Sequence, residues 1–168
     1  MPTSGGASYS GEGVFDVRSV GLQPDLLNAI PGTEEVWRGQ IAVADVSVNF
    51  GDRSYLMTLS DFREGPIGRV VAEGSYFRTD LNGIEYPFGQ ADGINARPNS
   101  TRAIDIFDPN GTYLGSPQVN DTTGDRNFVN FAGPGAEEIF GEPRAGIKTT
   151  VGGNRTIEFE GAYVAGRD

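Results

Sequence analysis

Short stretches in which apolar and polar residues alternate recur along the chain, and turn residues separate them. Alternation with a period of two is typical of a strand that buries one face. The clearest stretch is residues 156–167, where Ile157, Phe159 and Tyr163 face one way and two glutamates face the other. One side of this strand is therefore predicted to lie in a core and the other in water.

The same pattern predicts further strands at residues 6–15, 55–59, 70–76 and 102–107. Gly51-Asp52 and Asp108-Pro109-Asn110-Gly111 are typical turn sequences between such strands. We expect Gly133-Pro134-Gly135 to end a strand, because proline cannot donate a ladder hydrogen bond.

The run of residues 36–50 changes its pattern partway. Trp37, Ile41 and Val43 share one parity, whereas Val48 and Phe50 fall on the other. A strict period of two cannot survive this switch, so a bulge or bend is predicted near residues 44–45.

Three polar segments are long enough to be loops: residues 16–35, 81–100 and 118–127. Within the first, residues 23–30 fit one short helix that Pro31-Gly32 would end. Residues 136–140 are long enough for about one further helical turn, and the 81–100 segment is read as a long loop or a loosely paired hairpin.

Composition supports this all-β interpretation. The 168 residues suit one domain, residues 1–168, and the 25 glycines and 10 prolines indicate many turns. Strands at this spacing fit either a closed up-and-down barrel or a sandwich, and composition does not separate the two. The predicted core is Trp37, Ile41, Val43, Val48, Phe50, Leu59, Phe131, Ile157 and Phe159.

The net charge of −10 argues against two classes of partner. Nucleic acid and an acidic membrane surface would both repel the chain, and its thirteen basic residues are scattered, with Lys148 the one lysine. No apolar run approaches the roughly 20 residues that span a bilayer, so we expect no membrane insertion.

The chain contains no Cys and no His, which excludes much chemistry. Disulfides, thiol nucleophiles, a serine–histidine triad and lipid attachment through cysteine are all absent. A Ser–Lys dyad would depend on Lys148, which has no serine nearby in a known motif. Glu137-Glu138 suits the first turn of a helix better than acid–base work, because adjacent helical residues point about 100° apart. We therefore expect no enzymatic activity.

No cofactor is expected either. Calcium is the metal that the abundant Asp, Asn and Gly would suit best, but the candidate oxygen ligands lack the spacing of an EF-hand loop. Turn formation is the preferred interpretation of these residues. They form two sets: Asp105, Asp108 and Asn110, and Asn120, Asp121 and Asp125.

Several patches, in order along the chain, resemble the transferrin-binding protein B-like β-barrel family. Residues 5–11 resemble the opening strand, and residues 46–51 resemble a hydrophobic strand that ends in Asn-Phe. Residues 127–141 run from an aromatic strand through a Gly-Pro turn into an Ala-x-Glu segment, and residues 156–167 resemble the Gly-Ala-aromatic closing strand. The resemblance implies an antiparallel up-and-down barrel of about eight strands with one or two short helical turns.

The resemblance also implies a secreted or cell-surface module that binds a protein or a small nutrient through its loops. The best-known members carry a lipidated Cys and two lobes, and this chain has neither the Cys nor the length, so transferrin binding itself is not carried over. Residues 1–6 hold no basic or apolar signal region, so we expect a mature or trimmed chain or one that uses no standard export signal. The alternative that stays open is a structural subunit of an extracellular filament or a viral particle.

A barrel wall offers no free edge, so recognition is expected in the connections. Of the three long ones, only residues 81–100 combine aromatics with glycine. Tyr86 and Phe88 are the predicted anchor, and Asp80, Glu85 and Asp92 around them would favour a basic partner. The competing interpretation is that these rings, with Tyr113, plug the end of the barrel.

Overall fold

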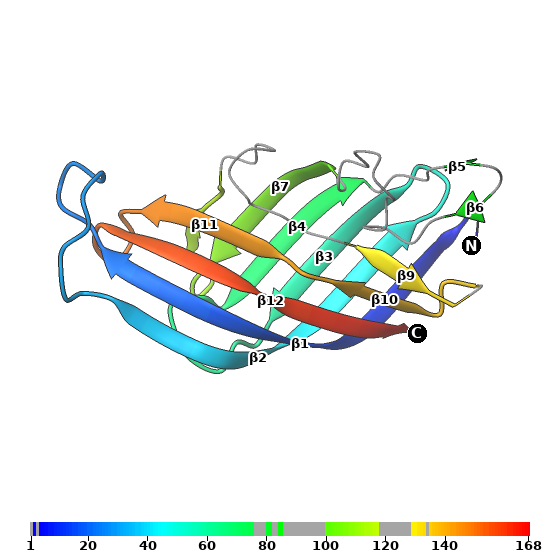
Figure 1. Ribbon diagram of the computed structural model, residues 1–168, viewed down its shortest axis with the longest axis horizontal. Helices are drawn as coiled ribbons and strands as arrows, with labels where there is room; N and C mark the ends of the chain where they lie inside the picture. Colours follow the sequence, from blue (N-terminus) through cyan, green and yellow to red (C-terminus); the bar gives the residue numbers. More distant parts are fainter. Residues whose placement is uncertain are drawn as a thin grey trace.

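The computed structural model describes residues 2, 4–75, 80–81, 84–85, 100–117, 129–133 and 135–168. Ten of its strands form one antiparallel sheet, and two short ones pair separately (Figure 1). The long strands are β1 (Gly6–Gly21), β2 (Glu35–Asn49), β3 (Ser54–Ser60), β4 (Arg69–Ser75), β7 (Ser100–Phe107) and β12 (Arg155–Arg167). The short strands are β5 (Asp80–Leu81), β6 (Ile84–Glu85), β8 (Tyr113–Gly115), β9 (Asn130–Ala132), β10 (Glu138–Gly141) and β11 (Arg144–Thr149).

The strands follow an up-and-down order. Along the sheet they run β8-β7-β4-β3-β2-β1-β12-β10-β9, and β11 pairs with β12 beside β10. β1 and β12, the first and last strands, are therefore neighbours, paired from Tyr9–Arg167 to Gly21–Arg155. The prediction of an all-β, antiparallel, up-and-down fold is confirmed.

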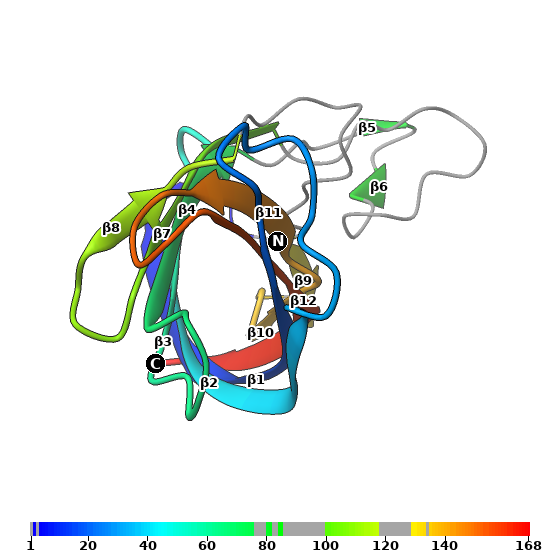
Figure 2. The ribbon, with the colours of Figure 1, turned by 90° about the vertical axis from the view of Figure 1, so that its left-hand side faces the viewer.

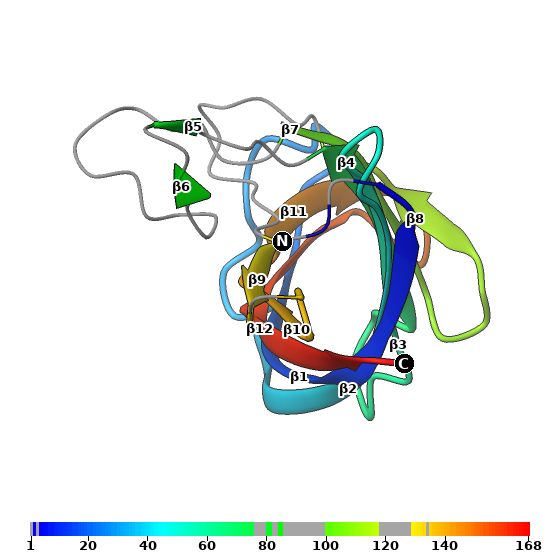
Figure 3. The ribbon, with the colours of Figure 1, turned by 90° about the vertical axis from the view of Figure 1, so that its right-hand side faces the viewer.

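The sheet curls around a central core, as the two end-on views show (Figures 2 and 3). Its two ends approach each other at β8 and β11, where a Cβ added to Gly115 would lie 3.7 Å from Ile147 Cδ1. No ladder joins β8 to β11 in the part of the chain that the structure describes. β8 and β11 thus lie close together at this seam without being paired to each other.

The inner face is apolar, as alternation predicts. Val48, Phe50, Leu59, Ile157 and Phe159 are buried as predicted. Trp37 and Phe131 are partly buried and pack against the same core. The other large side chains that are almost completely buried are Tyr9, Phe15, Val17, Val46, Met57, Ile67, Ile104, Ile106 and Ile139.

The predicted parity switch is real, but it lies earlier in the chain than expected. Phe15 pairs with Gln40 and Val17 with Trp37, so β2 carries one extra residue between these pairs. Gly39 has φ of 61°, and its N–H donates to Asp16 Oδ1 at 2.8 Å. A glycine in the left-handed region is the residue that such a bulge requires.

The bulge also corrects two predicted core residues. After Gly39 the even-numbered residues of β2 face inward, from Gln40 through Val48. Ile41 and Val43 therefore lie half-buried on the outer face, and assigning them to the core was wrong. No bulge occurs at residues 44–45, where β2 keeps its register with β3.

The short helical turns were also predicted wrongly, since the described residues contain no helix. Residues 23–30 form turns closed by the Leu22–Ala29 bridge. The segment after residue 135 turns at Ala136, with φ of 56°, and then enters β10 at Glu138. Within the described ranges there is accordingly no apolar helix of membrane-spanning length.

Candidate functional site

The predicted anchor lies largely outside the described residues. Tyr86, Phe88 and Asp92 belong to the undescribed part of the chain. Asp80 and Glu85 are paired through the backbones of β5 and β6. The anchor itself stays a prediction.

A second candidate is the connection between β1 and β2, residues 22–34, called here the binding loop. Its first residue, Leu22, is buried, whereas Leu27 is 75% exposed and Ile30 is 39% exposed. Apolar side chains held this far out of a core are candidates for contact with another molecule.

Asp25 gives the tip of the binding loop a fixed shape. Its Oδ1 accepts hydrogen bonds from the backbone N–H groups of Leu27 at 2.9 Å and Asn28 at 3.2 Å. Its Oδ2 accepts the Asn28 side-chain amide at 2.8 Å. These bonds stabilise the ionised carboxylate and hold the pKa of Asp25 below its usual value.

The backbone at the tip of the binding loop is strained at one residue, and hydrogen bonds stabilise this strained conformation. Leu26 has φ of 57°, a conformation that leucine seldom adopts. The Leu26 N–H donates to the Gln23 carbonyl at 2.9 Å and the Gln23 N–H donates to the Asn28 carbonyl at 2.9 Å. Such strain persists only where surrounding bonds fix the backbone, and it clusters at functional sites.

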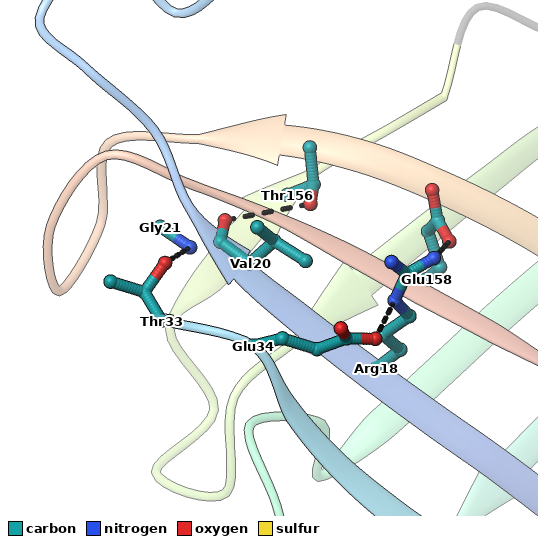
Figure 4. A network of polar contacts seen from close by, with 7 residues as sticks. All are labelled: Arg18, Val20, Gly21, Thr33, Glu34, Thr156 and Glu158. Atoms are coloured by element: carbon teal, nitrogen blue, oxygen red, sulfur yellow. Dashed lines mark hydrogen bonds and ion pairs between the residues drawn. The ribbon is translucent and has the colours of Figure 1, made fainter. Parts of the chain in front are cut away.

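Hydrogen bonds join the base of the binding loop to the end of β1 and to the turn before β12 (Figure 4). Thr33 Oγ1 accepts the Gly21 N–H at 3.0 Å and donates to the Ile30 carbonyl at 2.7 Å. The Leu22 N–H donates to the Asn154 carbonyl at 2.7 Å, which ties the loop to the turn before β12.

An ion pair reinforces the same place. Arg18 Nε lies 2.6 Å from Glu34 Oε1, and Arg18 Nη1 lies 3.7 Å from Glu158 Oε2 (Figure 4). All three side chains are about half exposed, so solvent screens these contacts and each stabilises by well under about 1 kcal/mol.

Of the two carboxylates considered for catalysis, one binds the backbone and the other is exposed. Glu137 accepts the Gly135 N–H with both oxygens, at 3.2 and 3.1 Å. Glu138 stands exposed on β10, so the helix that this pair was expected to begin does not form. Lys148 is likewise exposed, on β11.

The first candidate calcium set forms turns. Asp108 Oδ1 accepts the N–H groups of Asn110 at 2.9 Å and Thr112 at 2.7 Å, and Asp105 accepts a hydrogen bond from Ser116 Oγ. The second set, residues 120–125, lies outside the described residues. Over the described ranges, no group of three or more acidic side chains gathers as metal ligands would.

A shallow groove of about 440 Å³ lies on the outer face beside the β2–β3 turn. Asp52 lines it, but Asp52 Oδ1 already accepts the backbone N–H and the hydroxyl of Ser54, at 3.0 and 2.6 Å. Because this carboxylate is already hydrogen-bonded within the chain, the groove is a weaker candidate for a binding site than the binding loop.

Sequence reasoning recognised residues 16–35 as a long connection but preferred residues 81–100, which combine aromatics with glycine. It also assigned residues 23–30 to a short helix that Pro31-Gly32 would end. The Pro24-Asp25 pair was the available contrary signal, since Asp commonly bonds to the backbone two residues on.

No family model and no curated protein sequence matches this chain. Among solved structures, a surface lipoprotein is similar over 99% of this chain and 63% of its own, with 13% identity and a TM-score of 0.41. A Trp-176-Ala mutant of transferrin-binding protein B from Haemophilus parasuis Hp5 is similar over 99% of this chain and 27% of its own, with 13% identity and a TM-score of 0.37. The chain thus spans less than two thirds of the length of either protein.

Proposed function

We propose that this chain is a non-enzymatic binding module, secreted or exposed on a bacterial cell surface, that engages a protein partner through the binding loop. The location follows the sequence resemblance to the transferrin-binding protein B-like barrels. The binding role rests on one observation: Leu27 is 75% exposed at the tip of a loop whose shape three hydrogen bonds to Asp25 stabilise.

Rigidity matters because binding a flexible loop costs conformational entropy. A loop that already has its bound shape avoids that cost, so its contacts contribute more fully to affinity. Leu27 and Ile30 project from the surface, which suits a hollow on another protein better than a small molecule.

Photo-crosslinking tests the proposal. Leu27 is replaced by a photoreactive amino acid in cells that make the protein, and Leu56, an exposed leucine on β3, receives the same replacement as the control. We expect one discrete crosslinked protein from position 27 and none from position 56. The variant Leu27→Ala should then weaken binding of that protein about tenfold, a typical loss for an apolar anchor. Equal or absent crosslinking at the two positions would contradict the proposal.

The non-enzymatic part of the proposal has its own test. Assays across hydrolase and transferase substrates should remain at background, because the chain lacks His and Cys, and Glu137 and Asp108 use their carboxylates to accept backbone N–H groups. Activity that disappears on changing Glu137 or Lys148 would overturn it.

Self-assembly is the outcome that would favour the structural-subunit alternative. Size-exclusion chromatography with light scattering measures the molar mass in solution. A mass near 17.9 kDa at all concentrations agrees with a binding module, whereas rings or polymers would favour a filament or particle subunit.

A further inference from the structure

An exposed apolar surface lies on the outer wall of the sheet, far along the strands from the binding loop. Four strands contribute to it, and they lie side by side in the order β10-β12-β1-β2 (Figure 1). Its members, called the wall patch, are Phe140, Val164, Ala162, Val14, Val43 and Ile41.

The strand register places these residues in two adjacent rows. In one row Phe140 pairs with Val164, Val164 with Glu12, and Glu12 with Val43. In the other row Ala162 pairs with Val14, and Val14 with Ile41. Directly paired residues of an antiparallel sheet have Cβ atoms about 5 Å apart, so the patch is continuous.

This surface is apolar where water-facing residues are expected. Val14 and Val164 are each 57% exposed and Phe140 is 41% exposed. The outward positions of one-sided antiparallel sheets are normally polar, and a continuous apolar patch rimmed by polar residues commonly marks a contact with another molecule.

The wall patch contains one charge, the exposed carboxylate of Glu12, which stands between Val164 and Val43. Glu12 has no ion pair or hydrogen bond partner in the part of the chain that the structure describes. Asp45 and Glu138 stand exposed in the next row, on β2 and β10.

Basic residues on the other side of the patch are already paired. Arg38 lies 3.7 Å from Asp16, and Arg144 lies 3.6 Å from Glu160. The free charge at the wall patch is therefore negative.

We propose that the wall patch docks a partner protein that presents apolar side chains around a lysine or arginine. The apolar rows would cover the partner's apolar side chains, and its cation would pair with Glu12. Desolvation inside such a contact strengthens the attraction between the two charges and makes the choice of a basic partner selective.

Charge also disfavours a second copy of this chain as the occupant. Two identical patches would bring the acidic groups of one chain, Glu12 with Asp45 and Glu138, against the same groups of the other. The chain's net charge of −10 adds a general repulsion between copies.

A peptide-display library tests the chemistry of the partner. Random 12-residue peptides are selected on the wild-type chain, and those that also bind the variant Val14→Thr/Val164→Thr are discarded. Threonine keeps the branched shape that suits a strand but reduces the apolar surface. The melting temperature of the variant confirms that it remains folded.

We expect the retained peptides to carry lysine or arginine next to apolar residues. Their affinity should fall about fivefold or more in Glu12→Gln and should weaken as salt is added. Glu73→Gln, which alters an exposed glutamate on the outer face of β4, is the matched control and should change nothing.

Three results would overturn the proposal: no peptide that depends on Val14 and Val164, retained peptides that are neutral or acidic, or affinity unchanged in Glu12→Gln. Sedimentation of the wild-type chain adds a fourth. A dimer that Val14→Thr/Val164→Thr dissociates would show that a second copy covers the wall patch. Loss of the binding loop's partner would leave all four results unaffected, because the two surfaces share no residue.

Discussion

Tyr9 and Tyr163 both point into the core, but their hydroxyl groups have different surroundings. Tyr9 donates a hydrogen bond to the Ala136 carbonyl at 2.7 Å. The Tyr163 hydroxyl is buried and has no hydrogen bond partner in the described part of the structure. An unsatisfied buried hydroxyl destabilises the folded state, whereas a satisfied one contributes about 1 kcal/mol.

Replacing each tyrosine by phenylalanine should therefore change stability in different directions. Tyr9→Phe removes a hydrogen bond and leaves the Ala136 carbonyl unsatisfied, so we expect a loss of about 1–2 kcal/mol. Tyr163→Phe removes an unsatisfied group and should leave the free energy of unfolding unchanged or slightly raised. Urea titrations of the two variants measure both values, and equal losses would mean that Tyr163 also has a partner.

The pH dependence follows from the same two side chains. Burial raises the pKa of Tyr163 and of Tyr9 above the ordinary value of 10.0. Above pH 10 the unfolded chain releases these protons while the folded chain retains them, so the free energy of unfolding falls as pH rises. Below pH 10 their contribution is fully present.

We therefore expect stability to decline steadily from about pH 10 upward, and the decline to be shallower in Tyr163→Phe. Melting temperatures measured between pH 8 and pH 11 test this. A variant with the same slope as the wild type would show that Tyr163 titrates normally.

At the scale of single residues, the sequence predicts which face a side chain points to better than which residue it contacts. Alternation placed Tyr163 on the inner face of the last strand correctly. No local pattern shows that the Tyr9 hydroxyl meets Ala136, because 127 positions separate the two residues. Contacts of this kind depend on how the sheet curls, and alternation carries no information about curl.

At the scale of single elements, β1 and β12 approach each other so closely at Gly161 that a side chain there would clash with β1. A Cβ added to Gly161 would lie 2.1 Å from the Val14 carbonyl oxygen and 2.5 Å from Phe15 Cδ1. The Phe15 ring packs beside Phe159, with 6.3 Å between ring centroids. Glycine at 161 thus makes room for an aromatic core side chain.

Gly161→Ala should therefore be destabilising, since the clash involves the backbone and a buried ring. We expect a loss of about 2 kcal/mol, typical of overpacking. Gly166→Ala is the control on the same strand, because nothing lies within 4 Å of a Cβ there, and its stability should stay within about 0.5 kcal/mol of the wild type. Thermal or urea unfolding of both variants gives the comparison, and equal stability would contradict the close approach.

Most elements could be predicted from the sequence, and the exceptions have physical reasons. The alternation at residues 55–59 and 102–107 matches β3 and β7, and the turn at residues 108–111 closes through Asp108. The bulge in β2 was expected, but its position was not. The prediction grouped Trp37 with Ile41 and Val43 on one face and placed the bulge after them. Ile41 and Val43 lie on the outer face, and the bulge comes before them, at Gly39.

The candidate sites were harder to predict than the strands. Residues 23–30 of the binding loop were read as a helix because Pro31-Gly32 follows them, and Ile41 and Val43 of the wall patch were read as core. The second error came from the assumption that apolar side chains are buried, which fails where a protein contacts another molecule. Sequence–structure disagreement of this kind is expected at functional surfaces.

For the whole molecule, the strands of the sheet differ in how extensively they are hydrogen-bonded to their neighbours. β1 pairs with β12 from Tyr9 to Gly21 and with β2 from Gly6 to Ser19, so its backbone is bonded on both sides. β8 pairs with β7 at Gly115 and Tyr113 and with no other described strand. The seam between β8 and β11 therefore depends on contacts such as those around Ile147.

The protection of backbone amides from hydrogen exchange should differ between the strands in the same way. Amides of β1 and β12 should exchange only through global unfolding, whose free energy is typically about 5–15 kcal/mol, whereas β8 amides should exchange through local opening of the seam at lower free energy. Ile147→Ala should lower β8 protection further, because Ile147 is buried against the core at the seam. Native-state exchange in low denaturant, followed residue by residue, separates local from global opening. Amides of β8 as slow as those of Phe159 would mean that backbone hydrogen bonds close the seam and that the sheet forms a continuous barrel.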